Sequence, residues 1–334
     1  MSGPGPLRAA IIGAGWIAGS HAAALADRDD VILTAVCDLD EQRAAALAAP
    51  SGARVYGDWA QLLDTEELDA LWVCTPPQAH AGPAVAALDR GLPVYLEKPV
   101  ARSQADARLI TAAAARSQAV CAVGYQWHAL EVLEPLRAAL APYPIACLVG
   151  ESIGGTQSRP WFLDQAAGGG NLLERGSHHI DLIRAVAGEI VAVQAASSPV
   201  RLAPRPAGAT GDIDDVVTVL LHFASGALGT IVVAWTAETV PSSYWLEVIA
   251  DGAAIRLDLE SAGRISGSAG GQPVSVAGQV LPFQRSIGQF VAAVRAGDPA
   301  LACCTPADAA RTLAVVEAAE QSMVTGGRVP VADD

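Results

Sequence analysis

Leu7-Arg-Ala-Ala-Ile-Ile12 runs directly into Gly13-Ala-Gly15-Trp16-Ile17-Ala18-Gly19, and this stretch decides the fold of the first half of the chain. The apolar run predicts a short buried strand, and the alanine-rich residues up to Ala26 predict a helix. Between them, Gly13 permits the backbone angles of a tight turn, Gly15 lets a pyrophosphate approach, and Ala18 lets helix and strand pack closely. The stretch therefore predicts a dinucleotide-binding unit.

A second apolar run, Val31 to Cys37, ends at Asp38, about twenty residues after the glycines. A carboxylate at this place binds the ribose hydroxyls of a dinucleotide. The next arginine is Arg43, so the sequence offers no evident partner for the 2′-phosphate of NADP. We therefore expect NAD as the cofactor, with NADP second.

Strands and helices alternate through residues 1–123. Further strands are predicted at 70–74, 92–96 and 119–123, and helices at 40–49, 59–63, 80–90 and 104–116, the last with a capping box at Ser103 and Asp106. This alternation is typical of a doubly wound parallel sheet with helices on both faces. We predict a Rossmann domain over residues 1–123.

The pattern changes over residues 124–334. A helix at 129–140 and a strand at 145–151 precede long β-branched runs, which tight turns join at Ser225-Gly226 and Asp251-Gly252. Two helices follow, at 283–295 and from Pro306, capped by Thr305, to Gly326. The second domain is predicted to be α+β, with a large and mainly antiparallel sheet.

Composition excludes several kinds of partner. A formal charge of −14 argues against nucleic acid and anionic membranes, and no apolar run approaches the roughly 18 residues of a membrane span. The start of the chain lacks the features of a signal peptide, so we expect a cytoplasmic protein. The six cysteines show no C-x-x-C spacing, and we expect core residues in a reducing compartment and no metal site.

Lys98, in Val94-Tyr-Leu-Glu-Lys-Pro-Val100, is the only lysine among the 21 basic residues. A surface charge could be arginine here as elsewhere, whereas an ammonium that exchanges a proton cannot be replaced by a guanidinium. The residue follows a predicted strand, where open α/β sheets bind their ligands. Chance survival of one lysine is the alternative; we take Lys98 as the chemical centre.

A second group of candidate residues lies in Gly168-Gly-Gly-Asn-Leu-Leu-Glu174-Arg-Gly-Ser-His178-His-Ile-Asp181. Asn171, the only asparagine, is predicted to cap a helix. Glu174, His178 and Asp181 would then share one helical stripe, with His179 turned about 100° away. A solvated helix edge is the alternative. A histidine held by a carboxylate is typical of general acid–base chemistry near neutral pH.

Together these residues resemble the glucose-fructose oxidoreductase / inositol dehydrogenase (Gfo/Idh/MocA) family over nearly the whole chain. The resemblance rests on the glycine turn, Thr75-Pro76-Pro77 with His80, Glu97-Lys98-Pro99 and Glu174-x-Gly176-x-His178-x-x-Asp181. It implies a Rossmann domain, a C-terminal domain whose open sheet packs on another subunit, and catalytic positions for Lys98 and His178. Inositol dehydrogenase-like members carry aspartate at the place of Glu174, and many relatives carry arginine at the place of His128.

The expected reaction is hydride transfer between a secondary alcohol of a sugar, sugar derivative or cyclitol and a nicotinamide, with Lys98, His178 and Glu174 as catalytic residues. Predicted cofactor-binding residues are Gly13, Gly15, Trp16, Ile17, Asp38, Thr75, Pro76, His80, Glu97 and Gln126. Predicted substrate-binding residues are Lys98, Trp161, Glu174 and His178. His80 could instead cap its helix, Trp127 and Trp161 could be core residues, and His21 is expected to be structural.

Two other functions remain open at the level of sequence. An NAD-dependent glycoside hydrolase would release sugar without net NADH formation, and a non-catalytic sensor would bind the dinucleotide alone. Lys98 argues against the sensor, because binding alone does not require the only lysine. The expected partners are a small sugar or polyol and further copies of the chain, as a homodimer or homotetramer.

Overall fold

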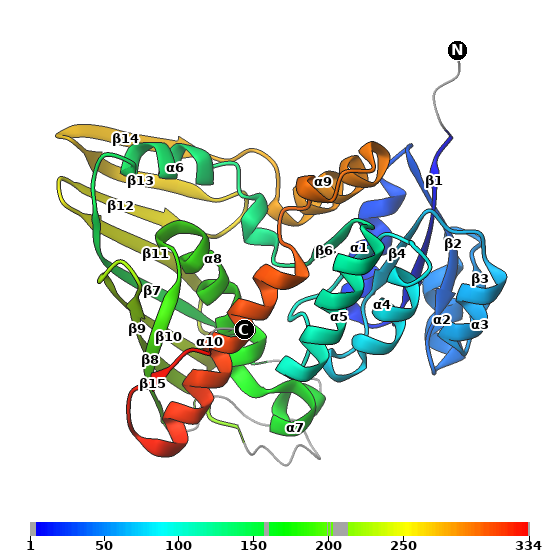
Figure 1. Cartoon of the computed structure of the whole chain (residues 1–334), viewed down its shortest axis with the longest axis horizontal. Coiled ribbons are helices and arrows are strands. Elements are labelled where there is room, and N and C mark those ends of the chain that lie inside the picture. The colour runs from blue at the N-terminus through cyan, green and yellow to red at the C-terminus, as the bar shows by residue number, and fades with distance from the viewer. Residues whose placement is uncertain (1–4, 157–159, 199, 201, 203–212, 333–334) are drawn as a thin grey trace. The chain divides into compact units, whose positions relative to one another are not determined.

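The computed structural model describes all residues except 1–4, 157–159, 199, 201, 203–212 and 333–334 (Figure 1). The chain packs into two compact units: Met1–Tyr125 with Ser286–Ala310, and Gln126–Arg285 with Arg311–Asp334. The predicted domain boundary after residue 123 lies near the first passage between units. The return of Ser286–Ala310 to the first unit was not predicted.

The first unit is built around a six-stranded parallel sheet. Its strands are β1 (Leu7–Ile12), β2 (Val31–Cys37), β3 (Arg54–Tyr56), β4 (Ala70–Val73), β5 (Val94–Leu96) and β6 (Cys121–Val123). Its helices are α1 (Trp16–Ala26), α2 (Glu41–Ala48), α3 (Trp59–Thr65), α4 (Ala81–Leu88) and α5 (Gln104–Ser117), with short 3₁₀ turns η1 (Pro77–Ala79) and η5 (Pro299–Leu301). The strand order β3-β2-β1-β4-β5-β6 confirms the predicted Rossmann topology.

The carboxyl edge of this sheet is held by hydrogen bonds that continue past the strands. Gly13 N–H donates to Cys37 O at 2.7 Å, Cys74 N–H to Ile12 O at 2.7 Å, and Glu97 N–H to Val73 O at 2.9 Å. The chain changes direction across the sheet between β1 and β4, where open α/β sheets bind ligands. The residues after β1, β2, β4 and β5 are therefore fixed at the predicted binding edge.

Polar caps and aromatic packing explain why this unit takes its shape. The Ser103 side chain accepts the Asp106 N–H at the start of α5, which confirms the predicted cap. Trp72 and Tyr95 pack against Phe290 of α9 (Pro282–Ala296), with ring centroids 5.2 and 5.5 Å apart. Because Phe290 fills this core, the segment that carries it belongs to the first unit.

The second unit contains a nine-stranded sheet in the order β14-β13-β12-β11-β7-β10-β9-β8-β15. Its strands are β7 (Ile145–Gly155), β8 (Ile190–Ser198), β9 (Val216–Phe223), β10 (Leu228–Thr236), β11 (Ser243–Ala250), β12 (Ala253–Asp258), β13 (Arg264–Ala269), β14 (Gln272–Ala277) and β15 (Val329–Pro330). All described pairs are antiparallel except β7 with β10, so the predicted fold class is confirmed.

Helices cover one face of this sheet, as Figure 1 shows for α6 (Leu133–Leu140), α8 (Ser177–Ala187) and α10 (Pro306–Thr325), the last of which begins in the first unit. The second unit also contains the short helical segments η2 (Gln126–Ala129), η3 (Pro160–Leu163) and α7 (Gln165–Gly168) and the π-helical turn η4 (Leu172–Gly176). Along β7, Leu148, Gly150 and Ser152 are buried while Val149 and Glu151 are half-buried, so one face is covered more than the other. Within the described ranges, no helix is long and apolar enough to cross a bilayer.

Candidate active site

The glycine turn after β1 has the geometry that a bound pyrophosphate needs. Gly13 has a φ of +93°, and a Cβ there would lie 2.7 Å from the Cys74 and Thr75 backbone. A Cβ on Gly15 would meet nothing within 4 Å, so this side of the turn is open among the described residues. Trp16 and Ile17 begin α1, whose first backbone N–H groups favour an anion. The turn fits the predicted role.

Asp38 is held in place beside this turn. Its carboxylate accepts the Ala14 N–H at 2.7 Å and the Asp40 N–H at 2.8 Å, which leaves acceptor capacity for ribose hydroxyls. Arg43 Nη2 lies 3.2 Å from the same carboxylate, and Arg43 Nε lies 3.1 Å from Asp40. The sequence had indicated no cation here, but this guanidinium faces two carboxylates.

His80 supports the loops that follow β4 and β5. Its ring is fully buried, with Nε2 2.8 Å from Thr75 O and Nδ1 3.2 Å from Val100 O. Burial lowers its pKa, so the imidazole is neutral near pH 7. The side chain makes no helix cap, so the capping alternative was wrong. Thr75 and Pro76 are half-buried at the sheet edge.

Glu97 forms a buried pair with His21 directly before Lys98. Glu97 is 7% exposed, and its Oε1 lies 2.7 Å from His21 Nε2. Burial alone would raise the pKa of Glu97, but the hydrogen bond from His21 and the charges of His21 and Lys98 bring it below its ordinary value. Its other oxygen accepts the Lys98 N–H at 3.1 Å. His21 is therefore structural, as predicted. The pair also fixes the backbone that precedes Lys98, which is half-buried.

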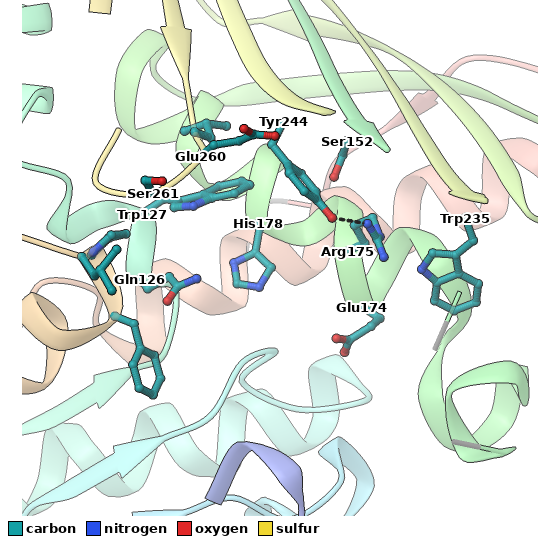
Figure 2. A pocket seen from close by; sticks show the side chains of 14 residues that line it. Gln126, Trp127, Ser152, Glu174, Arg175, His178, Trp235, Tyr244, Glu260 and Ser261 are labelled. Carbon is teal, nitrogen blue, oxygen red and sulfur yellow. Dashed lines mark hydrogen bonds between the residues drawn. The ribbon is translucent and has the colours of Figure 1, made fainter. Parts of the chain in front are cut away.

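The second unit contains a pocket of about 530 Å³, a volume typical of small-molecule sites. It is lined by Gln126, Trp127, Ser152, Glu174, Arg175, His178, Trp235, Tyr244, Leu259, Glu260, Ser261, Leu281, Pro282 and Phe283. Figure 2 shows His178 between Gln126 and Trp127 on one side and Glu174 and Arg175 on the other. The pocket thus combines aromatic surface with polar groups, which suits a sugar.

Glu174 and His178 reach this pocket from a π-helical turn and the helix that follows it. The turn spans Leu172–Gly176, and α8 begins at Ser177. The predicted cap at Asn171 was wrong: its backbone is helical, and its side chain donates to Asp215 O at 2.8 Å. The extra residue of a π-turn alters which side chains share a face, and such turns are frequent at functional sites.

Asp181 does not line the pocket, although it was predicted on the same stripe. Its Oδ2 lies 2.6 Å from His128 Nε2, and its Oδ1 accepts the Thr312 hydroxyl at 3.1 Å. Burial raises the pKa of Asp181, and the contacts with His128 and Thr312 partly offset this. His128, which replaces the arginine that the resemblance implies for many relatives, thus lies beside Asp181.

Trp127 lies beside two consecutive histidines, of which only His178 lines the pocket. The Trp127 ring lies 5.3 Å from the ring of His178 and 4.8 Å from that of His179, measured between centroids. His179 is fully buried with Nε2 3.3 Å from Trp245 O, and burial lowers its pKa to about 4. As predicted, His179 faces away from the pocket. The side chain of Trp161 lies outside the described residues.

Two family models match most of the two domains. Residues 7–125 match "Oxidoreductase family, NAD-binding Rossmann fold", and residues 146–256 match "GFO/IDH/MocA C-terminal domain". The chain belongs to the Gfo/Idh/MocA family. It is therefore a nicotinamide-dependent oxidoreductase, and the resemblance inferred from the motifs is confirmed.

Two relatives of this Gfo/Idh/MocA protein are named for a cyclitol and a sugar. Myo-inositol 2-dehydrogenase of Thermotoga maritima is 29% identical over 227 residues, 67% of each chain. D-apiose dehydrogenase of Paraburkholderia graminis is 28% identical over 233 residues, 67% of this chain and 59% of that one.

Solved structures share the fold along the whole chain. Levoglucosan dehydrogenase in complex with NADH and L-sorbose has a TM-score of 0.87 at 21% identity, covering 99% of this chain and 100% of that one. GenD2 from gentamicin A biosynthesis, in complex with NAD, has a TM-score of 0.84 at 26% identity, covering 100% and 98%.

Several pocket residues of this family member were missed from the sequence. Ser152, Trp235 and Tyr244 come from three strands of the large sheet, and Arg175 follows Glu174 directly. Only Arg175 could have been predicted from the sequence, because it lies in the stretch between Gly168 and Asp181 that contains Glu174 and His178. The others become neighbours only through strand pairing.

Proposed function

We propose that this protein reversibly oxidises a secondary alcohol of a sugar, sugar derivative or cyclitol, with NAD as hydride acceptor. One observation carries the proposal: Glu174 and His178 line a polar, aromatic pocket in a chain whose Rossmann unit has an open glycine turn. The names of the inositol and apiose dehydrogenases support the same substrate class.

In the proposed mechanism His178 takes the proton of the substrate hydroxyl. Lys98 stabilises the developing alkoxide with its ammonium, and Glu174 orients the sugar or the imidazole. Trp127 offers aromatic surface to the apolar face of the sugar ring. When bound, the nicotinamide supplies the redox chemistry, and the protein supplies position and charge.

The cofactor would be held by the residues at the carboxyl edge of the parallel sheet. Gly13, Gly15, Trp16 and Ile17 would hold the pyrophosphate at the start of α1, and Asp38 would accept the ribose hydroxyls. Thr75, Pro76 and Gln126 would contact the nicotinamide half, whereas buried His80 and Glu97 would support these loops from behind. We propose NAD over NADP, because Asp38 and Asp40 outnumber the one arginine beside them.

A panel of sugars and cyclitols, assayed for NADH absorbance with NAD and in parallel with NADP, tests the proposal. We expect at least one monosaccharide or cyclitol to give NADH, with a higher kcat/KM for NAD than for NADP. Aryl glycosides complete the panel: chromophore release with NAD but without NADH accumulation would establish the hydrolase instead. No turnover together with full NAD binding, unchanged in Lys98→Arg, would establish the sensor.

We also propose a homodimer or homotetramer that forms through the less covered face of the large sheet. Val149 and Trp245 are half-buried and Ile249 is exposed on that face, where they alternate with Glu151 and Glu247, a mixed apolar and charged surface of the kind found at subunit interfaces. Light scattering should give at least two subunits for the wild type and fewer for Val149→Glu; a monomeric wild type would contradict this. A cytoplasmic location is proposed as well, which the six free cysteines fit.

A further inference from the structure

A second polar cluster lines the pocket on the side of the large sheet. It consists of Ser152 on β7, Trp235 on β10, Tyr244 on β11 and Arg175 from the π-helical turn; we call it the strand-side cluster. Tyr244 is the cross-strand partner of Ser152, and Trp235 is the partner of Gly154. Because Ser152 and Gly154 are two residues apart, these side chains share one face of three neighbouring strands.

Gly154 leaves the space in which two members of the cluster meet. A Cβ at this position would overlap both Arg175 Nη1 and Tyr244 Oη, which form a hydrogen bond there. Arg175 Nη2 also donates to Gly155 O at 2.9 Å. The guanidinium is therefore fixed by two acceptors, Arg175 lines the pocket beside Tyr244 (Figure 2), and the guanidinium retains further N–H groups that can donate.

The cluster holds hydrogen-bonding groups that lack partners. Ser152 Oγ and Trp235 Nε1 are buried in residues with 0% exposure, line the pocket, and have no hydrogen-bond partner among the described residues. Buried polar groups are normally satisfied, so two such atoms in a pocket that Arg175 also lines indicate a ligand. The indole and guanidinium can only donate, so the ligand must accept.

Charge distinguishes a carboxylate from a neutral hydroxyl as that acceptor. Burial lowers the pKa of Arg175, although Tyr244 and Glu174 partly offset this, so an anion beside it would relieve the cost of burying the cation. Figure 2 shows the Glu174 carboxylate directed away from the contact between Arg175 and Tyr244. A planar guanidinium also matches the two oxygens of a carboxylate in geometry.

We propose that the strand-side cluster binds a carboxylate of the substrate, so that the preferred substrates are acidic sugars such as uronic acids. The inference rests on the proposed dehydrogenase function and makes its substrate class narrower. Arg175 would hold the carboxylate, and Ser152 and Trp235 would donate to its oxygens. Glu174 and His178 would then face the ring hydroxyls of the same molecule.

The experiment compares two matched pairs, D-glucuronate with D-glucose and D-galacturonate with D-galactose. Each is tested on the NAD-saturated protein for NADH formation and, separately, for binding by calorimetry. The variants are Arg175→Gln and Ser152→Ala, with Arg264→Gln as the control, an exposed arginine on β13 of the same unit. Thermal unfolding verifies that each variant is folded, and Ser152→Ala carries the test if Arg175→Gln does not fold.

We expect at least one uronate to bind about tenfold or more tightly than its neutral partner. Arg175→Gln should lower the affinity for that uronate by about 100-fold and the affinity for the neutral sugar by less than about threefold. Ser152→Ala should lower the affinity for the uronate by about five- to tenfold. Arg264→Gln should change neither.

Failure of both uronates to bind more tightly than their neutral partners, or an equal loss of affinity for both members of a pair in Arg175→Gln, would overturn the inference. If neutral sugars are still oxidised in that case, the proposed function stands without it. Arg175-dependent binding of a uronate, without NADH formation from any sugar or cyclitol of the panel, gives the opposite result: the carboxylate subsite stands and the proposed dehydrogenase function fails.

Discussion

Glu97→Gln removes the charge from the buried pair that precedes Lys98 while keeping the size of the side chain. In the wild type Glu97 Oε1 lies 2.7 Å from His21 Nε2, Oε2 accepts the Lys98 N–H, and the His21 ring is fully buried. A charge-assisted hydrogen bond contributes about 1.5–3 kcal/mol, and removing one partner of a buried pair costs about 3–5 kcal/mol. We expect the variant to lose about 3 kcal/mol of unfolding free energy at pH 7.

The pH dependence gives this prediction a second, independent readout. The pKa of Glu97 is lowered in the folded protein. Its contribution to the unfolding free energy is therefore fully present above the pKa of the unfolded carboxyl, about 4.3, and is lost as the pH falls through the folded pKa. The difference in unfolding free energy between wild type and variant, measured with urea, should therefore be the same at about pH 7 and about pH 5 and smaller at about pH 3.5.

The matched control is Glu67→Gln, a glutamate whose side chain is 87% exposed and whose ion pair with Arg8 lies on the surface of the same unit. Its stability should not change measurably. Equal stability of Glu97→Gln and wild type at pH 7, or a difference that grows on acidification, would refute the account of the pair.

Three further changes test the binding edge and the large unit. Gly13→Ala should lower the free energy of unfolding by about 2 kcal/mol or more, because φ at Gly13 is +93° and a Cβ there would meet the backbone; urea unfolding measures this. Gly15→Ala should leave the unfolding free energy of the apoprotein nearly unchanged and lower the affinity for NAD about tenfold or more, which an NAD titration measures. His179, with a pKa of about 4, stays neutral in the folded state at pH 5, whereas the same histidine binds a proton in the unfolded state. The unfolding free energy of the wild type should therefore fall by about 2 kcal/mol between pH 7 and pH 5, and this loss should be absent in His179→Gln. A variant that loses as much as the wild type would contradict the burial of that ring.

Local patterns predicted most strands of the parallel sheet in the first unit. The predicted strands at Leu7–Ile12 and Val31–Cys37 have the bounds observed, because each is a continuous apolar run that ends at a polar or glycine residue. Strand β3 was missed, since two of its three residues are exposed and no apolar pattern marks it. The packing of Phe290 on Trp72 and Tyr95 joins residues about 200 positions apart, which no local pattern encodes.

The candidate site was predicted in part, for the same physical reason. Glu174 and His178 carry a spacing that can be read along the chain, and both line the pocket. The partner of Asp181 could not be read in this way, because His128 reaches it from a different helix. Ser152 became a pocket residue only through the pairing of β7 with β11, which depends on register rather than on local sequence.

The most direct test of the whole account is a kinetic cycle of Lys98→Met, His178→Asn and the double variant, measured on one sugar that the wild type oxidises, at saturating NAD. If both side chains serve one proton and hydride transfer, each single change should lower kcat by about 100-fold or more, and the double variant should be little slower than the slower single variant. A Lys98→Met protein that retains wild-type kcat, or two losses that simply multiply, would contradict the claim that the only lysine and this histidine act together.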